Sequence, residues 1–334
     1  MTVLPMKPEI SVVIPIYNEE QGLQALFDRL YPALDDLHMS YEIVFINDGS
    51  RDNSVSILAE QFRKRPDVTR VVLFNGNYGQ HMAILAGFEA SRGEIMVTLD
   101  ADLQNPPEEI KNLVAKMREG YDYVGSIRRK RQDSAWRTYA SKAMNQIRER
   151  ITNIKITDQG NMLRAYHRNV IDLVNQCGEV NTFVPALAYR FARKPTEITV
   201  EHEERSAGES KYSLYSLIRL NFDLVTGFSL VPLQFFSMMG MLMSIGSGLL
   251  VLVLLVRRLF LGAEAEGLFT LFAIAFFFMG MILFGIGLLG EYVGRIFQQV
   301  RARPRYVVQT VLQQKPGEEH LSDADAPEKR SVAR

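Results

Sequence analysis

The sequence is poor in cysteine, has no net charge and lacks a long apolar run near its N-terminus. Its 334 residues include a single cysteine, Cys177, which excludes an intrachain disulfide framework and any metal site built from several cysteines. Lys plus Arg and Asp plus Glu both number 38, so the net charge is zero and no basic excess favours nucleic acid as a partner. Residues 1–20 do not combine a basic start with an apolar run as long as that of a signal peptide, so we expect no signal peptide and a cytoplasmic N-terminal domain.

Charged side chains are also scarce between residues 224 and 290. Residues 224–256 and 267–290 contain none, and each stretch exceeds the roughly 20 residues that cross a hydrocarbon core. We predict transmembrane helices over 231–256 and 267–290, and Pro232 suits the first turn of the first helix. The arginines after the second helix outnumber the two in the short link, which places both termini in the cytoplasm. The alternative is a helical hairpin buried in a soluble core.

The segments on either side of this hairpin have their own patterns. Over residues 213–230 the apolar residues recur at helical spacing. This predicts a juxtamembrane amphipathic helix that either lies along the membrane surface or packs on the soluble domain. Residues 291–312 are expected to form a cytoplasmic C-terminal segment. Residues 313–334 are polar and contain Pro and Gly, which is typical of a disordered tail.

Residues 1–212 alternate between strand-like and helix-like patterns. Apolar, β-branched runs predict strands over 10–15, 41–46, 69–74 and 94–99. Helical patterns follow over 19–37, 53–65 and 80–91, and a fourth helix opens at Asn105–Glu109. Repeated strand–helix units imply an α/β domain with a mainly parallel sheet. Ligands of such sheets bind beyond the carboxyl ends of the strands.

Polar residues follow the four predicted strands where they end. They occupy 15–19, 47–50, 75–80 and 100–104, which should meet at one edge of the sheet. Asp100 and Asp102 share a face because they lie two residues apart, and with Gln104 they offer hard oxygen ligands for Mg²⁺ or Mn²⁺. No glycine-rich phosphate loop follows the first strand, so a divalent cation would have to neutralise a bound diphosphate.

Simpler interpretations exist for several of these residues. An Asp-x-Asp tripeptide alone is a weak signal, because Asp323–Asp325 repeats it in the tail. Asp48 could form a turn within its own polar segment, and Tyr17 could pack in the core. Three histidines have no spacing typical of a metal site and are interpreted as structural or exposed: His81, His167 and His202.

The motifs at the strand ends resemble those of the family 2 glycosyltransferases, which have the GT-A fold. The resemblance rests on Val-Ile-Pro-Ile-Tyr-Asn-Glu-Glu (13–20), Asn-Asp-Gly-Ser (47–50) and Leu-Asp-Ala-Asp-Leu-Gln-Asn-Pro-Pro-Glu (99–108). The runs Gly-Glu-Ser-Lys-Tyr-Ser (208–213) and Leu-Leu-Gly-Glu-Tyr-Val-Gly-Arg (288–295) narrow it to the polyprenyl-phosphate glycosyltransferases. Runs at 77–81, 162–166, 182–185 and 301–306 are similar to the branch that transfers 4-deoxy-4-formamido-L-arabinose.

The resemblance implies roles for particular residues of this chain. It assigns the uridine to Pro15, Tyr17, Glu19 and Asp48. It assigns further nucleotide contacts to Gln80, Asp100, Arg205, Ser210 and Lys211. It assigns Mg²⁺ or Mn²⁺ to Asp100, Asp102 and Gln104. It places the catalytic set near the acceptor phosphate and the sugar, with Arg128, Arg137 and Asp158 as its members.

Three positions depart from the family pattern. Asn47 stands where an aspartate is usual, and Gln159 and Asn161 replace Tyr and Cys around Gly160. These departures bear on the identity of the sugar more than on the reaction.

The resemblance implies transfer of a sugar from UDP to the phosphate of undecaprenyl phosphate. The second pKa of a phosphate monoester is about 6, so the nucleophile is anionic at neutral pH and needs no strong general base. The difficulty is the approach of two anions, which a divalent cation and docking arginines would relieve. A single displacement would invert the anomeric centre. A basic run predicts an amphipathic helix over 135–151 at the membrane surface, or else a solvated basic face.

The resemblance also implies a setting for the protein. It implies a multi-pass protein of the bacterial inner membrane, surrounded by lipids and assembled as a homo-tetramer, that serves lipid A modification and resistance to cationic peptides. One alternative is a glucosyl- or mannosyltransferase acting on the same lipid. Another is a membrane-anchored protein that binds or scaffolds nucleotide sugars without catalysis. A processive polysaccharide synthase is disfavoured because the Gln-x-x-Arg-Trp motif is absent.

Overall fold

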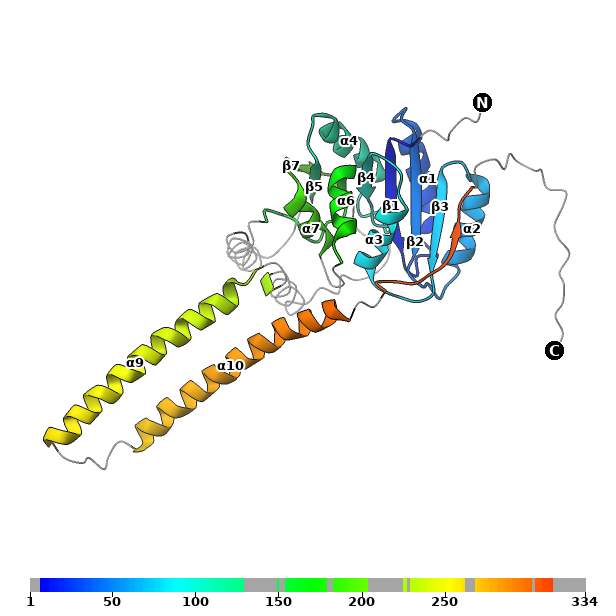
Figure 1. Ribbon diagram of the computed structural model, residues 1–334. Helices are drawn as coiled ribbons and strands as arrows, with labels where there is room; N and C mark the ends of the chain where they lie inside the picture. The colour runs from blue at the N-terminus through cyan, green and yellow to red at the C-terminus, as the bar shows by residue number, and fades with distance from the viewer. Residues whose placement is uncertain are drawn as a thin grey trace, which may run out of the picture.

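The structure, a computed structural model, describes residues 7–128, 149, 154–178, 183–203, 225–226, 229–261, 268–301 and 304–314. Four of the predicted site residues lie outside this part of the chain: Arg137, Arg205, Ser210 and Lys211. So do the tail from residue 315 onward and almost all of the predicted helices over 135–151 and 213–230. The described residues form an α/β domain from which two long helices extend (Figure 1).

The described part of the domain contains one mixed sheet of eight strands. In chain order these are β1 (Ile10–Ile16), β2 (Tyr41–Asn47), β3 (Thr69–Phe74), β4 (Ile95–Thr98), β5 (Tyr123–Arg128), β6 (Arg164–His167), β7 (Pro195–Val200) and β8 (Val308–Leu312). Their order across the sheet is β7-β5-β6-β4-β1-β2-β3-β8. β1 to β4 are parallel and β7 is parallel to β5, whereas β6 and β8 are antiparallel to their neighbours. The predicted, mainly parallel sheet is confirmed.

Helices cover both faces of this sheet (Figure 1). α1 (Leu23–Asp35), α2 (Ser54–Lys64) and α4 (Ile110–Arg118), the last opened by the 3₁₀ turn η1 (Pro107–Glu109), pack on one face around Phe45. α3 (Gln80–Ala90), α6 (Arg168–Gln176) and α7 (Val184–Phe191) pack on the other. α3 lies so close to β1 that a Cβ at Gly87 would fall 2.2 Å from Cγ1 of Val13. α1 is shorter than the predicted helix 19–37, because the residues before it form a loop.

The two long helices are α9 (Val231–Leu261) and α10 (Leu268–Val300) (Figure 1). Both helices end later than the predicted spans 231–256 and 267–290. The extra turns of α10 contain an ion pair between Glu291 and Arg295 (2.9 Å). Within the described residues one helix, Ile274–Val300, is long and apolar enough to cross a membrane, and the apolar part found in α9 is shorter, Val231–Met243. The predicted hairpin is therefore observed as a pair of helices, and its insertion into a membrane stays a prediction.

Close contacts join the two helices near the sheet domain. A Cβ at Gly285 would lie 2.0 Å from Cε1 of Phe236, so the absence of a side chain admits the ring. The hydroxyl of Tyr292 donates to the carbonyl oxygen of Ser229 (2.8 Å). By contrast, the outer apolar side chains of α10 are exposed, and Phe276 and Phe284 are each 66% exposed. An outward apolar surface of this kind suits lipid better than water.

β8 is not indicated by the sequence pattern, which predicts only a cytoplasmic segment over residues 291–312. It pairs antiparallel with β3, from Leu312 opposite Val71 to Val308 opposite Phe74. The pairing covers an edge of β3 that would otherwise present unpaired backbone groups. The chain therefore returns to the sheet after the helical hairpin.

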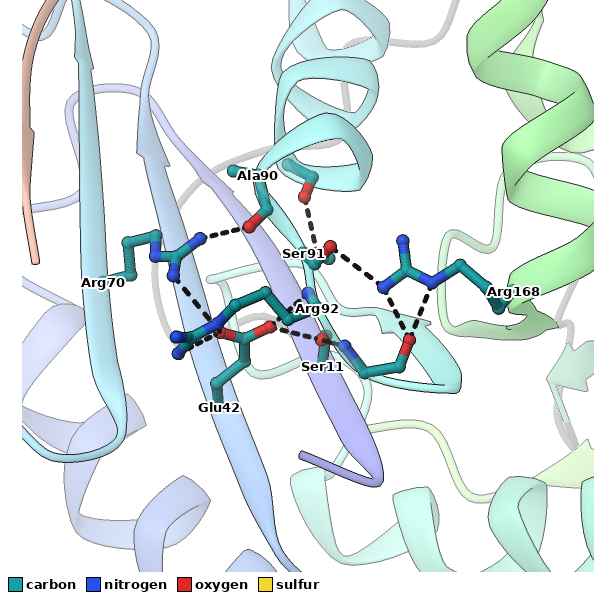
Figure 2. A network of polar contacts seen from close by, with 9 residues as sticks. Ser11, Glu42, Arg70, Ala90, Ser91, Arg92 and Arg168 are labelled. Carbon is teal, nitrogen blue, oxygen red and sulfur yellow. Dashed lines mark hydrogen bonds and ion pairs between the residues drawn. The ribbon is translucent and has the colours of Figure 1, made fainter. Parts of the chain in front are cut away.

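At the amino ends of the strands, a buried carboxylate joins three segments (Figure 2). Glu42 is 2% exposed and accepts hydrogen bonds from Ser11 Oγ (2.7 Å) and from the backbone N (2.5 Å) and Nε (2.9 Å) of Arg92. Gly93 N donates to Ser11 Oγ (2.8 Å), and Arg168 Nε donates to the Gly93 carbonyl oxygen (2.9 Å). The cluster holds β1, β2 and the turn before β4 in register.

Replacing Glu42 by alanine is expected to lower the free energy of unfolding by about 2 kcal/mol, because the donors of Arg92 and Ser11 lose their buried acceptor. Thermal unfolding in detergent would register this as a lower melting temperature. Glu60→Ala is the matched control, since Glu60 pairs with Lys64 on an exposed helix face (2.8 Å) and its loss should lower the melting temperature much less than the loss of Glu42. Equal melting temperatures for the two variants would contradict the role given to Glu42.

Candidate active site at the carboxyl ends of the strands

The loops after β1 and β2 are joined where these parallel strands end. Asp48 N donates to the Ile16 carbonyl oxygen (2.8 Å), Asn18 N donates to Ser50 Oγ (3.0 Å), and Arg51 N donates to Asn18 Oδ1 (2.8 Å). Asn18 has a φ of 56°, a conformation that asparagine tolerates better than most residues. These bonds hold the predicted nucleotide segments 15–19 and 47–50 next to each other.

The predicted uridine residues of the first loop differ in exposure. Tyr17 is 44% exposed, so the core-packing interpretation is wrong and the ring is accessible for stacking on a base. Pro15 and Glu19 are half-buried, and Ser54 Oγ accepts a hydrogen bond from Glu19 N (3.1 Å). The loop after β1 therefore presents the ring of Tyr17 to solvent, and hydrogen bonds to the segment after β2 hold its backbone.

Asp48 organises the loop that follows β3. Its side chain is buried and accepts from the backbone N of Tyr78 (2.6 Å) and of Gly79 (2.8 Å), one bond to each carboxylate oxygen. Burial raises the pKa of Asp48, and these two N–H groups act in the opposite direction. A Cβ at Gly49 would lie 2.4 Å from the carbonyl carbon of Gly76, so the two backbones touch. Asp48, which follows β2, thus fixes the loop 75–79 that follows β3. Its role is therefore larger than the local turn considered above.

Asp100 and Asp102 follow β4 as predicted. Gln80 Nε2 donates to Asp100 Oδ1 (2.7 Å), and Gln104 N donates to Asp102 Oδ1 (3.2 Å). Burial raises the pKa of Asp100 to about 7, and the neighbouring carboxylate of Asp102 adds to the rise, while Arg128 opposes it. Asp100 therefore lies in a place where a negative charge is unfavourable without a cation.

The donor chemistry here fits a divalent cation. The two carboxylates and the amide of Gln104 are hard oxygen groups, which Mg²⁺ and Mn²⁺ prefer. His202 adds a buried Nδ1 for which the described residues provide no hydrogen-bond partner. In the described part of the chain, no three His, Cys, Asp or Glu side chains are already arranged to hold an ion. The residues therefore fit a divalent cation by the chemistry of their ligand atoms.

Arg128 and Asp158 form a bidentate ion pair beside these carboxylates. Arg128 Nε donates to Asp158 Oδ2 (2.7 Å) and Nη2 donates to Oδ1 (2.8 Å), and the Asp158 side chain is almost fully buried. Arg128 is the last residue of β5, whereas Asp158 precedes β6. The sequence leaves open whether Asp158 orients the sugar, acts as a weak base or pairs with an arginine such as Arg164. The observed ion-pair partner is Arg128.

Arg164 stabilises the backbone next to this ion pair. It is fully buried in β6, and its Nη2 donates to the Asp158 carbonyl oxygen (2.6 Å). Its Nε donates to the Asn161 carbonyl oxygen (2.9 Å), and its Nη1 donates to Tyr123 Oη (2.6 Å). Arg164 therefore fixes the backbone at Asp158 and, with it, the position of the Asp158 carboxylate.

His202 is a site residue that the sequence does not reveal. It follows β7, and its pKa is lowered by burial and then by the nearby charge of Arg128, while Asp158 and Asp102 act in the opposite direction. Glu203 N donates to the Gln104 carbonyl oxygen (2.9 Å), which joins this segment to the Asp102 loop. No spacing signal marks His202, because only the pairing of β7 with β5 brings it here.

The three residues that depart from the family pattern share one property. Each has a buried polar side-chain atom without a hydrogen-bond partner in the described structure: Asn47 Oδ1, Gln159 Nε2 and Asn161 Nδ2. Such atoms are uncommon in folded proteins and mark places where a bound group can complete the hydrogen bonding.

The chain is similar to several known proteins. The family model described as Glycosyl transferase family 2 matches residues 11–174. The undecaprenyl-phosphate 4-deoxy-4-formamido-L-arabinose transferase of Shewanella sediminis is 52% identical over 306 residues, which cover 91% of this chain and 92% of that protein. Glucosyl-3-phosphoglycerate synthase from Mycobacterium tuberculosis, solved with Mn²⁺, uridine diphosphate and phosphoglyceric acid, is 18% identical with a TM-score of 0.47 and coverage of 66% and 76%. Mannosyl-3-phosphoglycerate synthase from Rubrobacter xylanophilus is 13% identical with a TM-score of 0.45 and coverage of 65% and 72%.

Proposed function

Since the chain belongs to glycosyl transferase family 2, we propose that it transfers 4-deoxy-4-formamido-L-arabinose from UDP to undecaprenyl phosphate. The observation that carries this proposal is the 52% identity, over nine-tenths of both chains, to the Shewanella sediminis protein whose name states that activity. The product would serve lipid A modification and resistance to polymyxin and other cationic peptides. The two aspartates after β4 and the neighbouring ion pair support a transferase over a protein that only binds nucleotide sugars.

The donor would occupy the carboxyl ends of β1 to β4. Tyr17 and Pro15 would contact the uridine, and Asp48 would shape the loop against which it lies. Asp100, Asp102 and Gln104 would hold Mg²⁺ or Mn²⁺, which supplies Lewis-acid stabilisation of the departing UDP. Gln80 keeps Asp100 oriented by its hydrogen bond. Arg205, Ser210 and Lys211 are assigned to the diphosphate by the family resemblance.

The acceptor phosphate would bind near Arg128. Asp158 fixes the guanidinium by two hydrogen bonds, and Arg137 is assigned a second contact by the resemblance. Because the acceptor phosphate is already anionic at neutral pH, Asp158 positions a charge rather than removing a proton. We infer a single displacement with inversion at the anomeric carbon. A product that retains the donor configuration would contradict this step.

The helical hairpin would place this chemistry at the cytoplasmic face of the inner membrane. Arg295, Arg301 and Arg305 follow the apolar part of α10, whereas Arg257 lies near the far end of α9, and this bias favours cytoplasmic termini. The exposed apolar surface of α10 supports contact with lipid. Assembly as a tetramer rests on the family resemblance and is a prediction.

The proposed function is tested by UDP release from purified protein in lipid nanodiscs. We expect release to require both undecaprenyl phosphate and Mg²⁺ or Mn²⁺, and to be fastest with the formamido-arabinose donor among UDP- and GDP-sugars. Chelation with EDTA should stop it. Faster release from UDP-glucose or GDP-mannose would overturn the assigned sugar, and tight UDP binding without acceptor-dependent release would overturn the enzyme assignment.

A further inference from the structure

The segment that follows the helical hairpin reaches the side of the sheet to which the nucleotide is assigned. α10 ends at Val300 and β8 begins at Val308, and β8 runs along the outer edge of β3 (Figure 1). Just before β8, Val307 accepts a hydrogen bond on its carbonyl oxygen from Asn75 N (3.1 Å). Asn75 is the first residue of the loop after β3. The backbone of the C-terminal segment is thus bonded to the same loop that Asp48 organises.

Tyr306 is the side chain that fills this junction. Its ring stacks on Phe74, with centroids 4.9 Å apart and planes at 13°. Its hydroxyl donates to the carboxylate of Glu89 on α3, and Arg305 lies 3.8 Å from the same carboxylate. The segment is therefore anchored to the last residue of β3 and to the helix behind it.

The ring stack continues into the loop that carries the donor site. Phe74 is buried and packs edge-on against Tyr78, with centroids 5.7 Å apart. Tyr78 N and Gly79 N are the two donors to the Asp48 carboxylate. Gly79 has a φ of 93°, a backbone conformation that residues other than glycine rarely adopt. Tyr306 thus supports, through two rings, the backbone amides that fix Asp48.

We propose that Tyr306 is a positioning residue for the donor nucleotide, whose binding loop 75–79 it orders by packing on Phe74 and, through Phe74, on Tyr78 of that loop. The inference rests on the proposed function, because it takes the Asp48 loop as the uridine side of the site. Without the ring, the loop would sample conformations in which Tyr78 and Gly79 do not meet Asp48, and the donor would have to order them on binding. The cost falls on donor affinity, since the acceptor site at Arg128 lies on β5 and is not part of this contact chain.

The test compares Tyr306→Leu with Tyr306→Phe in the full-length protein. Tyr306→Leu is expected to raise the Kd for UDP and the KM for the donor by about 10-fold, the range open to a lost aromatic pair, with kcat and the acceptor KM changed less than about twofold. Tyr306→Phe keeps the stack and should restore donor KM. Hydrogen exchange of the Tyr78 and Gly79 amides should be faster in Tyr306→Leu alone. Tyr121→Leu, a tyrosine before β5, is the control and should leave the donor KM unchanged.

The outcomes separate the inference from the proposed function. Unchanged UDP affinity and amide exchange in Tyr306→Leu, or an equal rise in the donor and acceptor KM values, would overturn the positioning role. Wild-type protein that binds no UDP would overturn the proposed function instead. If Tyr306→Leu does not accumulate as folded protein, Tyr306→Met is held to the same two results.

Discussion

Asp102→Asn is expected to lower kcat about 1,000-fold without changing the melting temperature, because a cation held at this site supplies several kcal/mol of transition-state stabilisation. This substitution removes the negative charge of Asp102 but keeps the shape of the side chain. Asp102 Oδ1 accepts from Gln104 N (3.2 Å), and the amide oxygen of asparagine can accept the same bond. What is lost is one of the two negative charges that would bind Mg²⁺ or Mn²⁺. The measurement is UDP release at saturating donor and acceptor over a range of Mn²⁺ concentrations.

The tail provides the matched control for this change. Asp325→Asn alters the same Asp-x-Asp tripeptide at its second occurrence, in the tail, and it should leave kcat unchanged. If Asp102→Asn retained full turnover at low Mn²⁺, the cation site would have to lie elsewhere, and the donor assignment at this edge would fail with it.

Proton and cation should also compete at this pair. The pKa of Asp100 is raised to about 7 by burial and by Asp102, so the carboxyl ionises as the pH rises through that value. Mn²⁺ affinity, measured by titration calorimetry without substrates, should therefore increase between about pH 6 and pH 8. In Asp102→Asn the like charge is gone, which moves the pKa of Asp100 downward and flattens this dependence.

Asp158→Asn is expected to lower kcat about 100-fold, because Arg128 loses one of two charge-assisted hydrogen bonds and the opposite charge that fixes it. If Asp158 only positions Arg128, the loss should be uniform from about pH 6 to pH 8. A general base would instead give a loss that depends on pH. Adding Arg128→Gln to Asp158→Asn should cost little more than either change alone, because the two side chains act as one unit.

Asp122→Asn is the control for this second substitution. Asp122 also has a carboxylate that accepts two hydrogen bonds, from Arg193 N (2.7 Å) and Lys194 N (2.9 Å), but it lies before β5, at the other end of the strand from Arg128. It should affect stability and leave kcat per folded molecule unchanged. Full turnover in Asp158→Asn would remove Asp158 from the catalytic set.

The sequence predicts β1 to β4 correctly because the local strand propensity of these segments agrees with their buried positions in the fold. β1 to β4 are buried, β-branched runs, and each is followed by a helical pattern, so their bounds are predicted to within about one residue. The polar residues after them are found at one edge because parallel strands point the same way. Asp100 and Asp102 are therefore placed correctly by pattern alone, whereas their cation remains a prediction.

The later strands depend on contacts that no local pattern contains. β6 is four residues long and has a fully buried arginine, Arg164, which donates to the carbonyl oxygens of Asn161 and Asp158 just before the strand and to Tyr123 Oη on β5. β8 forms because the chain returns after the helical hairpin and pairs with β3, the next strand of the sheet. His202 and the choice of Arg128 as the partner of Asp158 follow from the pairing of β5 with β7 and β6, which joins segments far apart in the chain.

The return of the chain along β3 bears on how the catalytic domain can be prepared without detergent. A fragment ending before α9 would omit Val308–Leu312 and Tyr306, and would leave β3 as a bare edge strand prone to self-association. A workable water-soluble fragment would replace the hairpin by a flexible Gly/Ser linker and keep residues 304–314 attached downstream. Such a linker-bridged enzyme would retain its nucleotide affinity while losing the two predicted transmembrane helices.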